Sequence, residues 1–593
     1  MPGGLMNLIS EGNQNIILTG NPTKSFFKCT YAKYTNFGLQ KFRIDYDGQR
    51  TLNLNADSNF KFKMPRTGGD LIMDTYLVVT LPTIWSPIIP PDSDINYDED
   101  NATINILNKW RPYEFKWIKH IGSQMIRSVR FTVGGQVIQE FTGSYLHAMV
   151  ERDFDANKKD LYYKMTGHVP ELNDPANAYN RVNVYPNAYV MDEAKGGAEP
   201  SIRSRNLYIP LNIWFTMASK MAFPISALQY NEFHIEVDIR PVKELYVIRN
   251  IPDKEDPGSY YHQSNFNEPR EQFYRFMHPP PSPQLLESDF DNTRTIWNAD
   301  VHLISTYAFL SEDEKRVFQL NEQTYLIKQI YTHHHKGIVG SAIIDIETRG
   351  MVSSWMWYLQ RSDILLRNEW SNYFNWPYEY LPYNAILPKN VASLQDVNIK
   401  IVEVNNTFAH PEEPNFLITP QHQLRQPNKK ASGEYSKTTV LPSSIALSGV
   451  YKQENLKNIM ESWGLIIDGK YRENTMDAGI FNYVEKYTRT AGNGPDGLYC
   501  YNFCLNNSAT DFQPSGAINM SKFNKIQFEL GLIHPPLDTN ATVDVVCNSD
   551  GNLVGIDKTH DNIFEYTYDL TVFEERYNIL TFSSGNAALS YAR

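Results

Sequence analysis

The chain has 593 residues, a formal net charge of −12 at pH 7 and an isoelectric point of about 5.7. A surface that binds nucleic-acid phosphates needs an excess of basic residues, so this balance argues against nucleic acid as a direct partner. Aromatic residues make up 13% of the chain, together with 34 prolines and 32 glycines. Because aromatic residues favour strands and Pro and Gly favour turns, the composition predicts an all-β protein with long loops.

The first 24 residues carry no basic stretch followed by a long apolar segment, so we expect no secretory signal there. No run of 18 uncharged apolar residues occurs along the chain, and we therefore predict no membrane-spanning helix. We expect residues 1–24 to form an arm outside the first folded domain that becomes ordered only on assembly.

A first β-rich region covers residues 25–242. Within it, residues 127–133 read as a strand that turns back at Gly134 and Gly135, because paired glycines accept the positive φ of a two-residue hairpin. Residues 233–240 alternate apolar and polar side chains without a break. This alternation predicts a strand with one buried face, which we take as the last strand of the region.

A second β-rich region is predicted to start at residue 299, with a strand at 301–305, and to reach residue 593. Soon after its start, Ser311 and Glu314 form a capping-box pattern that predicts a helix of about two turns. Residues 243–298, between the two regions, are polar and rich in proline. Such a composition predicts an extended linker that builds no core.

Three long segments carry few strand patterns and are rich in Pro, Asn, Asp and Tyr: Thr83–Gln124, Asp153–Arg205 and Asn405–Ser443. Loops of this length in compact domains usually serve function or partner binding. Moderate strands joined by very long loops favour jelly rolls over propellers or meanders.

Patterns that carry chemistry are missing from the sequence. It has no G-x-S-x-G nucleophile elbow, no Walker A loop and no H-E-x-x-H helix. The run His333-His334-His335 could suggest a metal site, but neighbouring side chains of a strand point to opposite faces and no acidic residue follows closely. We interpret the run as an exposed loop or strand end, and we predict no catalytic, cofactor-binding or metal-binding residues.

Four cysteines are too few for a disulfide framework in a chain of this length. Cys500 and Cys504 would lie about 13 Å apart along a strand, which is too far for a disulfide. We therefore expect buried free thiols.

Several short motifs stand in a fixed order along the whole chain. Gly20-Asn21-Pro22 lies near the N-terminus, and Gly134-Gly135 forms the predicted hairpin. Further motifs are Ala227 to Glu232, Gln513-Pro514-Ser515-Gly516, and Ser584-Gly585. This ordered set resembles the major capsid proteins of nucleocytoplasmic large DNA viruses, a group that includes algal and amoebal giant viruses.

The resemblance implies two consecutive eight-stranded antiparallel jelly rolls, a double jelly roll, with long inserted loops and few short helices. The first jelly roll would span residues 25–242 and the second 299–593, with 243–298 as a linker and 1–24 as an arm at the capsomer base. Three copies would form a pseudo-hexagonal capsomer. Our own hypothesis is that the three long segments form its outer tower and the contacts between subunits.

The resemblance also names the expected surroundings of the chain. Capsomers would tile the icosahedral shell of the virion and contact minor capsid and penton proteins. An internal viral membrane would lie nearby without being spanned, and assembly would take place in the cytoplasm of the host cell.

Two alternatives remain from the residues alone. A carbohydrate-binding, lectin-like jelly roll would use the same aromatic-rich loops. A metal-dependent or glycosidase-type jelly-roll enzyme would depend on His333 or His335, or on a pair of carboxylates that no spacing singles out.

Overall fold

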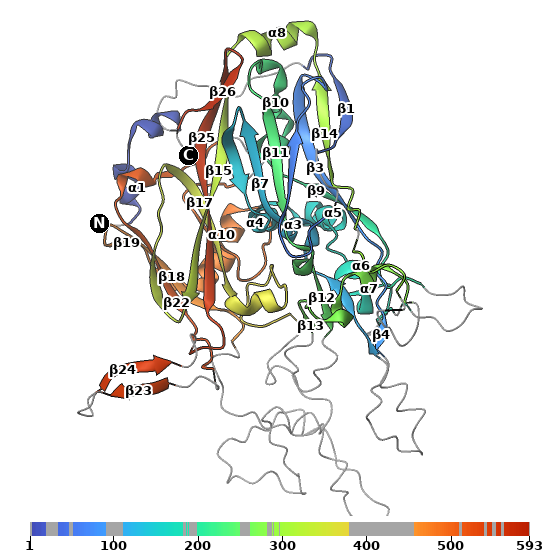
Figure 1. The fold of residues 1–593 in the computed structure, drawn as a ribbon. Coiled ribbons are helices and arrows are strands. Elements are labelled where there is room, and N and C mark those ends of the chain that lie inside the picture. Colours follow the sequence, from blue (N-terminus) through green and yellow to red (C-terminus); the bar gives the residue numbers. More distant parts are fainter. Residues whose placement is uncertain are drawn as a thin grey trace, which may run out of the picture.

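The structure is a computed structural model. It describes residues 3–18, 34–46, 51–89, 111–181, 185–186, 188, 199–249, 261–280, 288, 290–295, 297–378, 456–508, 513–538, 543–547, 553–558 and 563–591. These residues form two β-sandwiches that lie side by side, with helices between them (Figure 1).

The first sandwich contains two antiparallel sheets. One has the strand order β1-β14-β3-β10, with β9 also paired to β3, and the other has the order β2-β11-β7-β8. The strands are β1 (Gly38–Ile44), β2 (Ser58–Lys63), β3 (Leu71–Leu81), β7 (Ile126–Val133), β8 (Gln136–Phe141), β9 (Arg205–Pro210), β10 (Phe223–Pro224), β11 (Phe233–Ile239) and β14 (His302–Phe309).

The second sandwich repeats this plan. Its sheets have the orders β15-β25-β17-β20, with β21 on β17 and β26 on β25, and β16-β22-β18-β19. The strands are β15 (Gln323–Ile338), β16 (Ala342–Asp345), β17 (Met351–Arg361), β18 (Met460–Ile467), β19 (Lys470–Asp477), β20 (Tyr499–Asn502), β21 (Ile518–Asn519), β22 (Ile526–Leu532), β25 (Tyr568–Ser583) and β26 (Asn586–Leu589).

Both sandwiches share one connectivity. β9 with β10, and β20 with β21, are each counted as one position, and β26 is taken as a hairpin extension of β25. Each sandwich then has strand positions one to eight. One sheet then has the order 1-8-3-6 and the other 2-7-4-5 in both sandwiches. This two-sheet arrangement of eight antiparallel strands is the jelly roll, so the predicted double jelly roll is confirmed.

The strand β14 corrects the predicted start of the second jelly roll. The sequence places this strand in the second region, but it pairs with β1 from Gly38↔Phe309 to Ile44↔Leu303 and with β3 on its other side. It is therefore the eighth strand of the first jelly roll, and β11 is the seventh. In a jelly roll the eighth strand pairs between the first and the third, as β14 does here. Residues 243–298, which we call the excursion, separate β14 from β11, and their composition predicted a linker.

That excursion also builds core, which the linker prediction excluded. Its described part contains β12 (Tyr246–Arg249), β13 (Tyr261–His262) and α7 (Tyr274–Met277), and β12 pairs with β6 (Phe115–Trp117). The Tyr246 ring stacks on Phe115 at 4.5 Å between centroids, and Phe273 lies 5.2 Å from Tyr246. The aromatic side chains of the excursion bury apolar surface. The linker prediction missed them because it was based on the polar, proline-rich composition.

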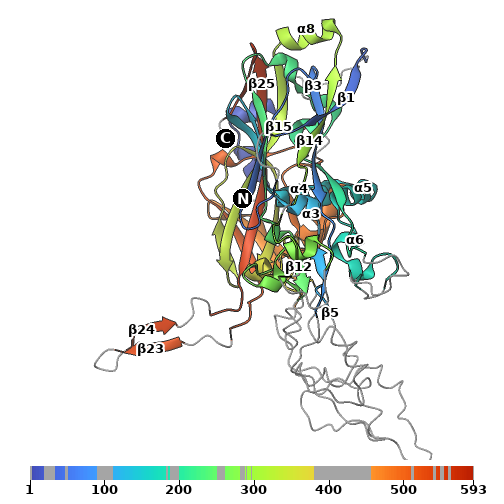
Figure 2. The same cartoon turned by 45° about the vertical axis from the view of Figure 1, so that its right-hand side comes forward.

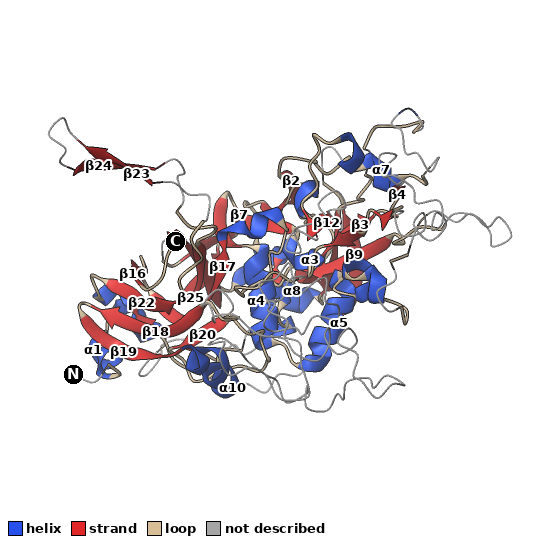
Figure 3. Cartoon of the chain, turned by 90° about the horizontal axis from the view of Figure 1, so that it is seen from below, coloured by secondary structure: helices blue, strands red, loops and turns tan. Residues whose placement is uncertain are grey.

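Three of the helices, α4 (Gly143–Asp153), α5 (Ala156–Thr166) and α6 (Pro170–Asn173), lie in the chain between β8 and β9. The short helix α3 (Ile121–Gln124) lies between β6 and β7, and it packs beside α4 (Figure 2). Thr142 caps α4 by accepting from the Tyr145 N–H, and Asp155 caps α5 by accepting from the Lys158 N–H. Viewed from below, α4 lies between the strands of the second sandwich and β3 and β9 of the first (Figure 3).

The helix predicted after Ser311 is confirmed as α8 (Glu312–Leu320), which connects the two sandwiches at the top of Figure 1. The Ser311 side chain makes no capping hydrogen bond, so the helix forms without the predicted box. Among the described helices, none combines the length and apolar character needed to cross a membrane. The remaining elements include β4 (Ile88–Ile89), β5 (Arg111–Pro112), α10 (Glu485–Arg489), β23 (Val543–Cys547) and β24 (Leu553–Lys558).

The N-terminal arm lies outside the first sandwich, as predicted. Its elements α1 (Leu5–Ile9) and η1 (Asn13–Ile17) pack on the second sandwich, where Met6 joins the core. Arg472 Nε donates to Asn7 Oδ1 at 3.3 Å, and Asn519 Nδ2 donates to Asn15 Oδ1 at 3.2 Å. Residues 3–18 thus contact the second sandwich of their own chain, and ordering of the arm on assembly stays a prediction.

Candidate functional site at the junction of the jelly rolls

A buried ion pair joins the two jelly rolls. Arg152, in the last turn of α4, belongs to the first jelly roll, and Glu575 lies in the middle of β25 in the second. Arg152 Nη2 donates to Glu575 Oε1 at 2.7 Å, and the two residues are 0% and 1% exposed. A charged pair this deeply buried is stable only when its remaining hydrogen-bonding groups are also satisfied.

Two further charges balance this pair. Arg152 also binds its neighbour Asp153 through Nε and Nη2, at 2.7 and 2.8 Å. Lys328 on β15 places its Nζ 3.4 Å from Glu575 Oε2. Burial by itself would raise the pKa of Glu575, but the charges of Arg152 and Lys328 outweigh burial and hold that pKa well below its usual range. The junction thus contains two cations and two carboxylates.

Two neutral groups donate further hydrogen bonds to the Glu575 carboxylate. Tyr145 OH donates to Oε1 at 2.9 Å, and Ser354 Oγ donates to Oε2 at 3.0 Å. With Arg152 and Lys328, each carboxylate oxygen therefore has two partners, which is the full capacity of the group. Asn507 supports the same network, because its Nδ2 donates to Ser354 Oγ at 2.7 Å and its Oδ1 accepts from Lys328 Nζ at 2.6 Å.

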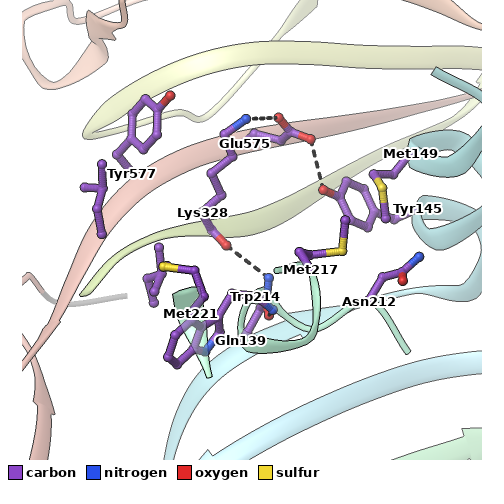
Figure 4. A pocket seen from close by; sticks show the side chains of 12 residues that line it. Gln139, Tyr145, Met149, Asn212, Trp214, Met217, Met221, Lys328, Glu575 and Tyr577 are labelled. Atoms are coloured by element: carbon purple, nitrogen blue, oxygen red, sulfur yellow. Dashed lines mark hydrogen bonds and ion pairs between the residues drawn. The ribbon is translucent and has the colours of Figure 1, made fainter. Parts of the chain in front are cut away.

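A second layer of contacts connects β8 directly to β15. Gln139 Nε2 donates to the Lys328 carbonyl at 3.0 Å, and Gln329 Nε2 donates to the Ile138 carbonyl at 2.8 Å. Beside these bonds lies a small cavity of about 70 Å³, lined by residues of both jelly rolls (Figure 4). The figure shows Tyr145 and Lys328 both pointing to Glu575 across this space. The junction therefore fixes the two sandwiches as one unit.

The predicted residues Gly134 and Gly135 form the turn between β7 and β8. Their φ angles are 57° and 81°, as the two-residue hairpin requires. The Gly134 N–H donates to the Glu232 carbonyl at 2.7 Å, and a Cβ on Gly134 would lie 2.8 Å from Asn231 Cγ. The hairpin motif and the motif at residues 227–232 thus contact each other.

The segment Gln513 to Gly516 holds the chain that leaves β20. Ser515 Oγ donates to the Asn506 carbonyl at 2.7 Å and accepts from the Asn506 N–H at 3.0 Å. Gly516 has a φ of 141°, and a Cβ there would lie 2.9 Å from the Phe503 carbonyl oxygen. By fixing residue 506, this segment positions the adjacent Asn507 in the buried network.

The remaining motif residues do not form one common site. Gly20, Asn21 and Pro22 lie outside the described residues. Gly585, at the β25–β26 turn, accepts from the Gln229 N–H at 2.9 Å, so the C-terminal motif of the second jelly roll contacts the first. The motifs are turns and close contacts that are spread over both jelly rolls.

His333 lies within β15 and not in a loop or at a strand end, so that interpretation is wrong. Its Nε2 is 3.8 Å from Glu574 Oε2, which means that the acidic neighbour comes from the adjacent strand β25. Cys500 and Cys504 are buried free thiols, as expected.

The sequence patterns did not identify the junction residues. Arg152 and Glu575 are 423 positions apart, and the one available hint is the acidic pair Glu574-Glu575 inside the apolar strand β25. One group in the described residues could hold a metal ion: His120, His147 and Glu151, whose ligand atoms lie within 4.8 Å of one another. No sequence pattern singled out these three residues, because His120 is 27 positions before His147 and only the packing of α3 and α4 brings them together.

Comparison with known proteins gives a consistent family. The family described as the major capsid protein N-terminus matches residues 25–263, and the large eukaryotic DNA virus major capsid protein matches residues 314–588. The chain is 24% identical to the major capsid protein of Chrysochromulina ericina virus, with 100% of both proteins covered.

Solved structures show the same fold. A chain of the PBCV-1 virus capsid has a TM-score of 0.52 at 16% identity, covering 96% of this chain and 100% of that one. The Faustovirus major capsid protein has a TM-score of 0.53 at 12% identity, covering 94% and 92%. The two family matches favour a structural role in the virion capsid over the lectin-like alternative. The chain belongs to the major capsid proteins of large eukaryotic DNA viruses.

Proposed function

We propose that three copies of this chain assemble into a pseudo-hexagonal capsomer and that such capsomers tile an icosahedral shell. The observation that carries the proposal is the repeated jelly roll, because both sandwiches have the same strand order and are fixed together by a buried junction. Three such chains in a ring present six similar sandwiches around one axis. A ring of this kind closes through head-to-tail contacts between different faces of neighbouring subunits.

The chain then acts as a structural unit and not as an enzyme. Its partners would be its own copies, neighbouring capsomers, and minor capsid and penton proteins. The net charge of −12 supports a shell component without direct nucleic-acid contact. An internal membrane would lie close to the shell without being spanned, and assembly would take place in the host cytoplasm.

The long insertions would form the outer tower and the contacts between subunits. Asn405–Ser443 lies outside the described residues, as do parts of Thr83–Gln124 and Asp153–Arg205. Deleting Asn405–Ser443 should leave both sandwiches folded, because the described strands of their sheets all lie outside this segment, but the deletion should weaken the trimer. A deletion variant whose trimer is as stable as the intact protein would remove this role.

Solution mass by light scattering tests the trimer directly. A trimer has three times the chain mass of 68.4 kDa, or about 205 kDa. A monomer across the accessible concentration range would contradict assembly by this chain alone. A glycan array on the same sample tests the lectin-like alternative, which predicts binding without a capsomer.

A further inference from the structure

Helices α3 and α4 bring three potential metal ligands together. His120 directly precedes α3, and His147 and Glu151 are four residues apart on α4, so their side chains occupy the same face of that helix. Their ligand atoms all lie within 4.8 Å of one another. Tyr145 and Arg152, which hold the junction, lie on a different face of α4. The three residues therefore form a site separate from the Glu575 network.

His147 has an unused ligand atom inside this site. The residue is 1% exposed, and its Nδ1 is buried without a hydrogen-bond partner. Glu151 Oε1 is 3.9 Å away, which is too far for a hydrogen bond. A buried ring nitrogen without a partner destabilises the fold unless something else binds it.

The surrounding residues hold the other two ligands in place. Lys159 Nζ lies 3.1 Å from Glu151 Oε2, and Tyr163 OH donates to Oε1. The His168 ring stacks on His120 at 3.7 Å between centroids, and its Nδ1 accepts from the His120 N–H at 3.2 Å. Metal centres commonly use an outer layer of this kind to orient their ligands.

We propose that His120, His147 and Glu151 bind one divalent transition-metal ion of the Zn²⁺ type. Two imidazoles and one carboxylate, with a fourth position for water, form a donor set that Zn²⁺ accepts. Tetrahedral ligands about 2.0 Å from Zn²⁺ are about 3.3 Å apart, so the group needs to contract by at most about 1.5 Å.

The ion would stabilise the junction. It would join the start of α3 to α4, the helix that carries Arg152 and Tyr145. The Gly492 N–H of the second jelly roll donates to the Arg152 carbonyl at 2.8 Å, so strengthening α4 also supports this contact.

The test uses the full chain after dialysis against a chelator. Titration with Zn²⁺ in a calorimeter should give one ion per chain, and Zn²⁺ should raise the melting temperature. His147→Gln and Glu151→Gln should each weaken binding at least about tenfold, since each removes one ligand. His333→Gln is the matched control, because His333 lies beside a glutamate but outside the group, and its Zn²⁺ affinity should equal that of the unchanged chain.

His120→Asn provides a second variant if the α4 variants fail to fold. His120 has a φ of 55°, and Asn tolerates this left-handed conformation, so the backbone is preserved while the imidazole is lost. Cobalt absorption on the unchanged chain gives an independent readout, with the strong visible bands of tetrahedral Co²⁺ expected. Absence of stoichiometric binding, or equal binding by His120→Asn, would overturn the proposal, whatever the solution mass of the protein.

Discussion

Arg152 and Glu575 form a 2.7 Å ion pair although 423 positions separate them, and both side chains are almost completely buried. One comes from a helix inserted in the first jelly roll and the other from the last long strand of the second. The pair makes the relative placement of the two sandwiches part of the folded core. In the proposed capsomer, this ion pair would keep the two sandwiches of each subunit in one fixed arrangement.

Replacing Arg152 should strongly destabilise the chain. Arg152→Met leaves the buried Glu575 carboxylate without its closest cation, and such a loss costs about 3–5 kcal/mol. Urea unfolding would show this as a lower midpoint. Arg43→Met is the control: Arg43 pairs with Asp300 at the surface, with side chains 44% and 38% exposed, and its loss should cost about 0–1 kcal/mol. Equal effects of the two changes would contradict a dominant role for the junction.

The same carboxylate should make stability depend on acid. The pKa of Glu575 is lower in the folded chain than its ordinary value of 4.5, so below about pH 4.5 the unfolded chain binds a proton that the folded chain does not. The stability contributed by Glu575 is therefore complete above that pH and is lost as the pH falls. Urea midpoints measured from neutral to acidic pH should fall more steeply for the unchanged chain than for Glu575→Gln. Parallel curves would show that another group controls acid unfolding.

The two hairpin glycines should differ in their tolerance of a side chain. Both need positive φ, which costs an L residue about 1–2 kcal/mol. A Cβ on Gly134 would also meet Asn231, whereas nothing lies within 4 Å of a Cβ on Gly135. Thermal melts should therefore show a larger decrease in melting temperature for Gly134→Ala than for Gly135→Ala. A larger decrease for Gly135→Ala would mean that the contact with Asn231 does not determine the cost of a side chain at Gly134.

The segment at residues 513–516 should act through the turn that it holds. Ser515→Ala removes two hydrogen bonds to Asn506 and should cost about 1–3 kcal/mol, measured by urea unfolding. Ser311→Ala serves as the control, because the Ser311 side chain makes no capping hydrogen bond, and its effect should be close to zero. An unchanged urea midpoint for Ser515→Ala would show that the two hydrogen bonds to Asn506 are not needed for stability.

Local chemistry in the sequence was enough to predict several elements of this fold. Alternation predicted β11, the glycine pair predicted the β7–β8 turn, and the residues after Ser311 predicted α8, because each depends on neighbours within a few positions. The short motifs, taken in their order along the chain, predicted the family.

The tertiary structure alone decided which strands belong together. The strand β14 pairs with β1, more than 250 positions earlier, so no local pattern could assign it to the first jelly roll. Arg152, Lys328 and Glu575, or His120, His147 and Glu151, meet only after the helices and sheets have packed. Charges and ligands act over a few ångströms in space, and the sequence records separation along the chain, which for these residues bears no relation to that distance.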